Sequence, residues 1–219
     1  MTIRTFSAPR TLAVSGLAML ALAGCVKRGD IDQTGGIVQI RSACPQVAIP
    51  AQTGDVTLFN PAGSTDARAM DVVASITNLR STCNDTGAQI YSEATFDVLA
   101  TRNAAGAART VTLPYFSTVV RGGTSVISKR VGQVTLNFES GATRAQATVK
   151  AGAFVDRDAA TLPQDIRDRI VKKRKAGDLD AATDPLADPD VRAALQRTSF
   201  ELLVGFNLTQ DQLRYNATR

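Results

Sequence analysis

The sequence of 219 residues contains no histidine and no tryptophan, and it contains only three cysteines. Without histidine the chain can form no Ser-His-Asp triad, no Cys-His dyad and no imidazole metal site. Three cysteines are too few for a four-thiolate zinc or iron–sulfur centre within one chain. We therefore expect no metal and no other cofactor, and enzymes that depend on these groups are excluded.

Several motifs of catalysis and binding are also missing. The sequence contains no Gly-x-Ser-x-Gly, Ser-x-x-Lys, P-loop, Gly-x-Gly-x-x-Gly or calcium-loop pattern. The formal net charge is only +5, which is too small to indicate a nucleic-acid partner. With 44% hydrophobic and 21% charged residues, the chain has the composition of a globular domain, not of a disordered or multi-span membrane protein.

The first 24 residues have the three-part pattern of a secretory signal peptide. Arg4 and Arg10 form a basic start, and residues 11–23 form an uncharged, mostly apolar run of 13 residues. This run is shorter than the roughly 20 residues that cross a bilayer as a helix. Small residues follow it, as a signal peptidase requires. The alternatives are an ordinary secretory signal with a chance cysteine, or a buried core helix.

The four residues Leu22-Ala23-Gly24-Cys25 resemble the lipobox of bacterial lipoproteins. The resemblance covers residues 1–25 only, and it implies cleavage before Cys25 and a diacylglycerol group on the Cys25 sulfur. Two or three acyl chains anchor a protein stably, so the implied partner is a membrane. Val26 stands where an Asp would imply retention in the inner membrane. The resemblance therefore implies a periplasm-facing anchor in the outer membrane.

Cleavage before Cys25 would change both the charge and the cysteine count. It removes two of the 25 basic residues and none of the 20 acidic ones, which leaves 195 residues with a side-chain charge of +3. With Cys25 lipidated, Cys44 and Cys83 remain, and two cysteines in an oxidising compartment favour a disulfide. We place Cys44 in a loop and Cys83 in a turn. A redox pair is the alternative, but the sequence has no Cys-x-x-Cys motif.

Residues 25–36 are polar and end in glycine, which predicts a short tether before a domain of residues 37–219. Alternating apolar and polar residues predict an antiparallel β-sandwich of immunoglobulin or fibronectin type. Pro114 indicates an edge strand or a bulge, and Thr209 is expected to cap a last helix. The expected strands are 37–40, 55–60, 70–79, 89–102, 109–120, 134–138, 143–154 and 200–208, the last being the most apolar and a central strand.

The alternation gives way to a helical pattern at about 161–197, which predicts a helical insertion before the last strand. Thr161 and Gln164 have the spacing of a capping box at the start of the first helix. Asp188 followed by Pro189 predicts the start of the second helix.

Charge is segregated within this insertion. Residues 165–175 hold six basic and two acidic groups, whereas residues 176–190 hold five Asp and no basic residue. The simpler interpretation is a solvated helix face followed by an acidic loop that folds back on it. The functional interpretation is contact with an anionic surface, which the acidic loop would weaken. The basic residues are Arg167, Arg169, Lys172, Lys173, Arg174 and Lys175.

Two functions from different classes follow from these observations. The first is a lipid-anchored, non-enzymatic envelope protein with a structural or binding role, whose partner is an envelope protein, lipopolysaccharide or peptidoglycan. The second is a histidine-free hydrolase of cell-wall glycans. Such an enzyme would need two carboxyl groups about 5–9.5 Å apart.

Overall fold

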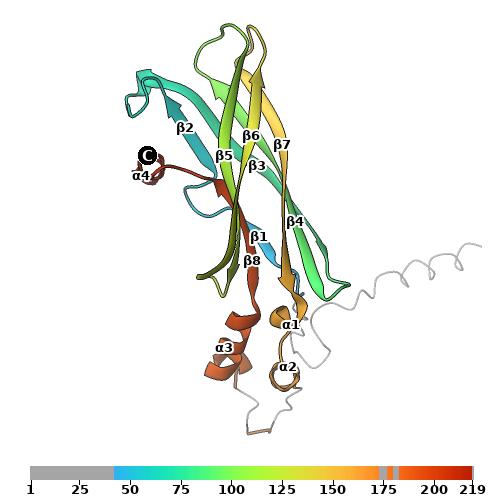
Figure 1. Cartoon of the computed structure of the whole chain (residues 1–219). Helices are drawn as coiled ribbons and strands as arrows, with labels where there is room; N and C mark the ends of the chain where they lie inside the picture. Colours follow the sequence, from blue (N-terminus) through green and yellow to red (C-terminus); the bar gives the residue numbers. More distant parts are fainter. Residues whose placement is uncertain (1–41, 173–176, 180–182, 219) are drawn as a thin grey trace, which may run out of the picture. The chain divides into compact units, whose positions relative to one another are not determined.

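The computed structural model describes residues 42–172, 177–179 and 183–218 of the chain (Figure 1). The expected signal peptide, the lipobox with Cys25, the tether and the strand at 37–40 lie outside these residues, as do Lys173, Arg174 and Lys175.

The described chain is mainly β, as predicted. Its strands are β1 (Gln46–Ala48), β2 (Asp55–Phe59), β3 (Met70–Asn84), β4 (Gln89–Arg102), β5 (Arg109–Arg121), β6 (Ser125–Phe138), β7 (Arg144–Asp156) and β8 (Phe200–Phe206). Its helices are α1 (Arg157–Ala160), α2 (Gln164–Val171), α3 (Pro189–Thr198) and α4 (Gln210–Thr218), with single 3-10 turns η1 (Ala67–Ala69) and η2 (Pro185–Ala187).

The strands form two four-stranded sheets that share one hydrophobic core. The strand orders are β1-β8-β5-β6 and β2-β3-β4-β7. Neighbouring strands run antiparallel, as predicted, except that the three-residue β1 runs parallel to β8. Phe96 of one sheet and Leu136 and Leu202 of the other are fully buried in the shared core.

The pleat of the strands explains how this core is filled. Side chains alternate between the two faces of a strand, and every second residue of β4 from Ile90 to Arg102 is buried. β8 lies between β1 and β5, so the prediction that the most apolar strand is central is confirmed. Its Leu202 and Val204 are fully buried.

Two strands are longer than the sequence pattern predicts. β3 runs to Asn84 and contains Cys83, so the predicted turn at this cysteine is wrong. β6 begins at Ser125, well before the expected strand at 134–138. Both extra segments are largely exposed, so they are held by pairing with β4 and β5 and leave no alternation of buried residues in the sequence. The predicted disulfide between Cys44 and Cys83 is present.

Pro114 lies neither in an edge strand nor at a bulge, contrary to the prediction. β5 lies between β8 and β6, and its register with β6 is continuous through Pro114. The Asn207 N–H donates to the Pro114 carbonyl (2.9 Å), one residue beyond the end of β8. The missing N–H of proline therefore falls at the last rung of the β5–β8 ladder, where its loss disturbs no further pairing.

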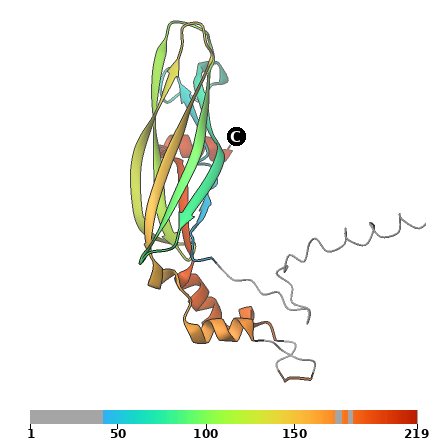
Figure 2. The same ribbon diagram turned by 90° about the vertical axis from the view of Figure 1, so that its right-hand side faces the viewer.

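Helices α1, α2 and α3 follow β7 and precede β8 in the chain, and they lie at one end of the strands (Figure 2). The predicted capping box is wrong: α2 begins at Gln164 after Pro163, with no side-chain cap, while the Thr161 hydroxyl donates to the Arg157 carbonyl. Asp188 does cap α3, as predicted.

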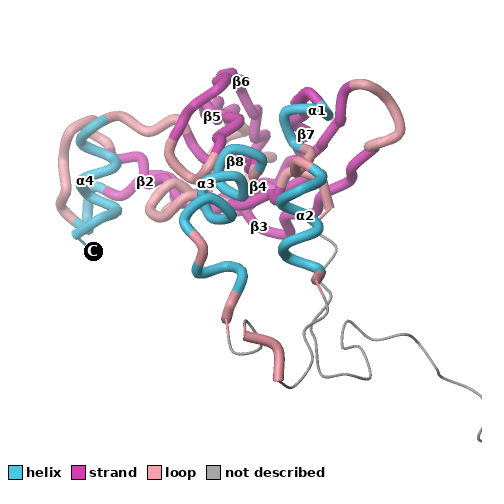
Figure 3. The backbone as a smooth tube through the Cα atoms, turned by 90° about the horizontal axis from the view of Figure 1, so that it is seen from below, coloured by secondary structure: helices cyan, strands magenta, loops and turns pink. Residues whose placement is uncertain are grey.

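Helices α2 and α3 share a small hydrophobic core of their own. Helix α4 lies apart from them, beside β2 (Figure 3). At α4 the Gln212 N–H donates to the Thr209 hydroxyl and the Gln212 side chain accepts from the Thr209 N–H, which confirms Thr209 as the cap. The core of α2 and α3 is formed by buried Ile166, Val191 and Ala194 with Leu162, Ile170 and Leu195 around them.

Candidate binding site between two edge strands

β6 and β7 are the edge strands of their two sheets and border the same side of the two-sheet body. They run close together near the turn that joins them, and they diverge toward the end that carries α1 and α3 (Figure 1). A hollow of about 180 Å³ lies between the diverging segments. We call this strip, bounded by residues 125–133 of β6 and 148–156 of β7, the β6–β7 seam.

The walls of the hollow carry small and polar side chains, and its floor is apolar. Ser128 comes from β6, while Gly152 and Ala153 come from β7. The floor includes Val119 of β5 and Leu202 of β8, which belong to the main core. Little side-chain volume therefore separates the core from the opening.

The pairing of β5 determines which main-chain groups of β6 are free. Because the carbonyl of Pro114 accepts from Asn207, the even-numbered residues of β5 direct their main-chain groups toward β8. The odd-numbered residues of β5 therefore face β6 and bond to its even-numbered residues. Lys129, Val131 and Gln133 consequently direct their N–H and C=O groups away from the sheet, and no described residue bonds to these groups.

The same argument holds for β7. The Arg102 N–H donates to the Thr143 carbonyl (2.9 Å) and the Arg157 N–H donates to the Ala88 carbonyl (3.0 Å), at the two ends of the β4–β7 ladder. The odd-numbered residues of β7 thus face β4. The even-numbered ones, Gly152 and Phe154 among them, direct their main-chain groups toward the seam.

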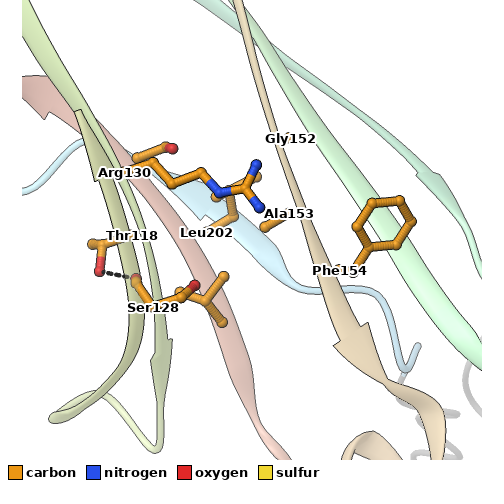
Figure 4. A pocket seen from close by; sticks show the side chains of 9 residues that line it. Thr118, Ser128, Arg130, Gly152, Ala153, Phe154 and Leu202 are labelled. Carbon is orange, nitrogen blue, oxygen red and sulfur yellow. Dashed lines mark hydrogen bonds between the residues drawn. The ribbon is translucent and has the colours of Figure 1, made fainter. Parts of the chain in front are cut away.

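Arg130 is the charged side chain of the hollow. It lies on the same face of β6 as the buried Val134 and Leu136, and its guanidinium points from β6 toward β7 (Figure 4). The Arg130 side chain is exposed, and none of the described residues forms a hydrogen bond or an ion pair with its guanidinium. An unpaired guanidinium beside an apolar floor can bind a carboxylate or a phosphate through two parallel hydrogen bonds.

Exposed apolar side chains lie along β6 next to the hollow. Val126, Ile127 and Val131 are 63%, 50% and 57% exposed, respectively. Lys129 lies on the outer face, with its ammonium group 5.2 Å from the centre of the Phe116 ring. An edge strand with such side chains and unpaired main-chain groups is a template for pairing with another chain.

The far wall of the seam is held by a cluster on the outer face of β4 and β7. The Glu93 carboxylate accepts from Lys150 (2.9 Å) and from the Tyr91 hydroxyl (3.0 Å). These hydrogen bonds, that of Lys150 first, hold the pKa of Glu93 below its usual value. The Tyr91 ring packs against Phe154 and covers Gly152, so any larger residue at this position would force the Tyr91 ring to move.

The structure describes three of the six basic residues of the predicted anionic-surface contact, Arg167, Arg169 and Lys172. Arg167 is exposed on α2, and Lys172 follows the end of that helix. Arg169 forms an ion pair with Asp188, the cap of α3, which is the fold-back contact that the simpler interpretation expects. Contact with an anionic surface remains a prediction.

The sequence analysis did not single out Arg130 or the other residues of the seam. A signal was present, because residues 109–138 contain four basic residues and no acidic one. Among these, Lys129 and Arg130 lie in the part of β6, residues 125–131, that is exposed on both faces. A charge of one sign on such an edge indicates a surface that excludes copies of itself and accepts an acidic partner.

Comparisons of the chain with protein-family models, with curated proteins and with solved structures found no match. Among the described residues, no helix is long and apolar enough to cross a membrane. In the same part of the chain, no group of three or more Cys, Asp or Glu side chains is placed to hold a metal ion.

Proposed function

We propose that this chain is a lipid-anchored, non-enzymatic binding protein of the bacterial envelope, held at the periplasmic face of the outer membrane by acyl chains on Cys25. The open β6–β7 seam carries the binding part of this proposal, because it combines free strand edges with the unpaired guanidinium of Arg130. The lipobox-like residues 22–25 carry the anchoring part. The partner is another component of the envelope.

The carboxylates favour binding over hydrolysis. A glycan hydrolase needs one carboxyl group whose pKa is raised, so that it can donate a proton. Among the described residues, the carboxyl groups whose pKa departs from the usual value, including Asp71, Glu93 and Asp97, are all shifted downward. Hydrogen bonds from Arg109, Lys150 and Asn78 are the leading causes in these three cases.

We also propose that the domain is a sandwich of immunoglobulin- or fibronectin-like type. Two four-stranded, largely antiparallel sheets around one core support this assignment. The disulfide departs from the immunoglobulin pattern, because Cys44 precedes β1 and Cys83 lies near the end of β3. The likeness is therefore one of architecture.

The anchor is tested by labelling cells with radioactive palmitate. Cys25→Ser should abolish incorporation of the label, because the thioether cannot form on serine. The double variant Cys44→Ser/Cys83→Ser is the matched control and should keep the label. Unchanged labelling of Cys25→Ser would refute the anchor.

Binding at the seam is tested by photo-crosslinking in intact cells. A photoreactive amino acid at Val131, on the free edge of β6, should give a specific adduct that mass spectrometry assigns to protein, lipopolysaccharide or peptidoglycan. The same group at Leu99, which is 46% exposed on β4, is the control and should give none. If the group at Val131 gave no adduct, or the same adduct as the group at Leu99, the result would count against the proposal.

A further inference from the structure

The two edges of the seam present the same chemistry at the same spacing. On β6, Lys129, Val131 and Gln133 offer unpaired N–H and C=O groups, and Gly152 and Phe154 do so on β7. Unpaired main-chain groups at every second residue match the repeat of an extended polypeptide. A glycan also carries donors and acceptors, but they are not spaced at the two-residue repeat of a strand.

From this match we infer that the seam binds an extended segment of a partner protein, which adds to β6 as a further strand and places a carboxylate side chain against Arg130. The inference deepens the proposed function and rests on it for the use of the seam as the binding site. Strand addition takes affinity from main-chain hydrogen bonds and specificity from the side chains that enter the hollow.

The side chains of the hollow define what the added strand carries. Successive residues of a strand point to opposite faces, so every second side chain of the partner would point inward. Inward apolar side chains would meet Leu202 and Val119, for which the small Ser128 and Ala153 leave room. The side chain beside Arg130 would be Asp or Glu, because a guanidinium binds a carboxylate through two hydrogen bonds.

Charge argues against a second copy of this chain as the occupant. Pairing with a second β6 would bring two Lys129-Arg130 pairs together, and β6 contains no acidic residue. Pairing with a second β7 would add Lys150 and Arg144, with Asp156 as the single acid of that strand. Like charges on neighbouring strands are destabilising, whereas an acidic partner is complementary.

The experiment uses the protein as purified from its cells, in detergent micelles, and two fluorescein-labelled heptapeptides. Thr-Val-Thr-Glu-Thr-Val-Thr places Val, Glu and Val on one face when it is extended, and the second peptide has Lys in place of Glu. Fluorescence anisotropy should show that the Glu peptide binds at least about tenfold more tightly than the Lys peptide. Absence of binding by the Glu peptide overturns the inference.

Two variants separate the main-chain and side-chain parts of the inference. Val131→Pro removes an outward N–H while the hydrogen bonds of Arg130 and Gly132 to β5 remain. The affinity for both peptides should therefore fall by at least about tenfold. Val131→Thr keeps the N–H and should bind as the wild type does. Arg130→Glu should reverse the preference, so that the Lys peptide binds more tightly. Unfolding midpoints close to that of the wild type establish that each variant is folded.

The outcomes distinguish this inference from the proposed function. If Val131→Pro binds normally and inorganic phosphate or lipopolysaccharide displaces the Glu peptide, the seam is an anion site and strand addition is wrong. If the photo-crosslink at Val131 captures peptidoglycan or lipopolysaccharide, the proposed function stands and this inference fails. If Cys25 carries no lipid but the peptide results hold, the anchor fails and the strand-addition site stands.

Discussion

Arg102 and Arg130 both direct a guanidinium from a strand toward the interior between the two sheets, yet their surroundings are opposite. Arg102, at the end of β4, is 6% exposed and donates to the carbonyls of Ala142, Ala107, Gly106 and Glu139 at 2.7–3.2 Å. It also lies over the Phe138 ring. Arg130, in the other half of β6, is exposed, and none of the described residues binds its guanidinium.

The contrast between Arg102 and Arg130 shows why the space between the two sheets is closed at one end and open at the other. At the closed end one guanidinium ties the β4–β5 loop to the β6–β7 turn, so the two edge strands meet over a sealed core. At the open end the same strands diverge, and the equivalent charge has neither loop to bind. Burial changes along β6 in the same way, since Val134, Leu136 and Phe138 are buried whereas residues 125–133 are largely exposed.

The largest effect is expected from Leu136, a fully buried residue in the closed half of β6. Leu136→Ala should lower the free energy of unfolding by about 2–5 kcal/mol, because it removes apolar contacts and leaves a cavity. Val131→Ala, five residues away in the open half, should change it by less than about 0.5 kcal/mol. Urea unfolding followed by circular dichroism measures both. Similar losses in the two variants would show that the seam is closed in solution.

A smaller but still clear effect is expected from Arg102. Arg102→Met keeps the aliphatic volume but removes the guanidinium donor of four carbonyls, of which those of Gly106 and Glu139 still accept from main-chain N–H groups. Because these carbonyls lie in turns where water can replace part of the loss, we expect a destabilisation of about 2–3 kcal/mol. Arg130→Met should leave the free energy of unfolding within about 0.5 kcal/mol of the wild type. Equal destabilisation by the two variants would mean that Arg130 has a structural partner.

Much of the fold could be predicted from the sequence because buried positions recur at regular spacing along a strand and are mostly apolar. In β4 mostly apolar residues alternate with polar ones, whereas β8 is apolar almost throughout, and both strands lie close to their expected positions. The caps at Asp188 and Thr209 were predictable for a local reason, since a side chain within three residues satisfies the free N–H groups. Thr161 has the same local pattern, but its hydroxyl is used at the end of α1, which only the packed structure reveals.

The candidate site could not be predicted in this way. Its free edges follow from the order of strands in the two sheets, and its hollow follows from the divergence of β6 and β7. Both depend on residues far apart in the chain. Ser128, Arg130 and Gly152 carry no motif in the sequence, and Arg102 has the same residue type as Arg130 with the opposite role. The local sequence feature that points to the site is the presence of basic residues and no acidic residue on β6.

The smallest effect is expected from the ion pair that links the two sheets at the closed end. Arg109 of β5 donates two hydrogen bonds, of 2.7 and 2.6 Å, to the carboxylate of Asp71 of β3. The hydrogen bond from Arg109 is the main reason why the pKa of Asp71 is lowered. Because the pair is partly exposed, we expect Asp71→Asn to cost less than about 1 kcal/mol at neutral pH.

The pH dependence of this variant follows from the direction of that shift. A carboxyl group whose pKa is lower in the folded chain stabilises it at pH values above about 4, the unfolded pKa, and the contribution is lost as the pH falls through the folded pKa. The difference in unfolding free energy between wild type and Asp71→Asn should therefore shrink toward zero in acid. In an Arg109→Met background the difference should be close to zero throughout, because the partner is absent. If it persists there with the same pH dependence, the two sheets are not joined through this pair, and the closed end depends on Arg102 and its carbonyls alone.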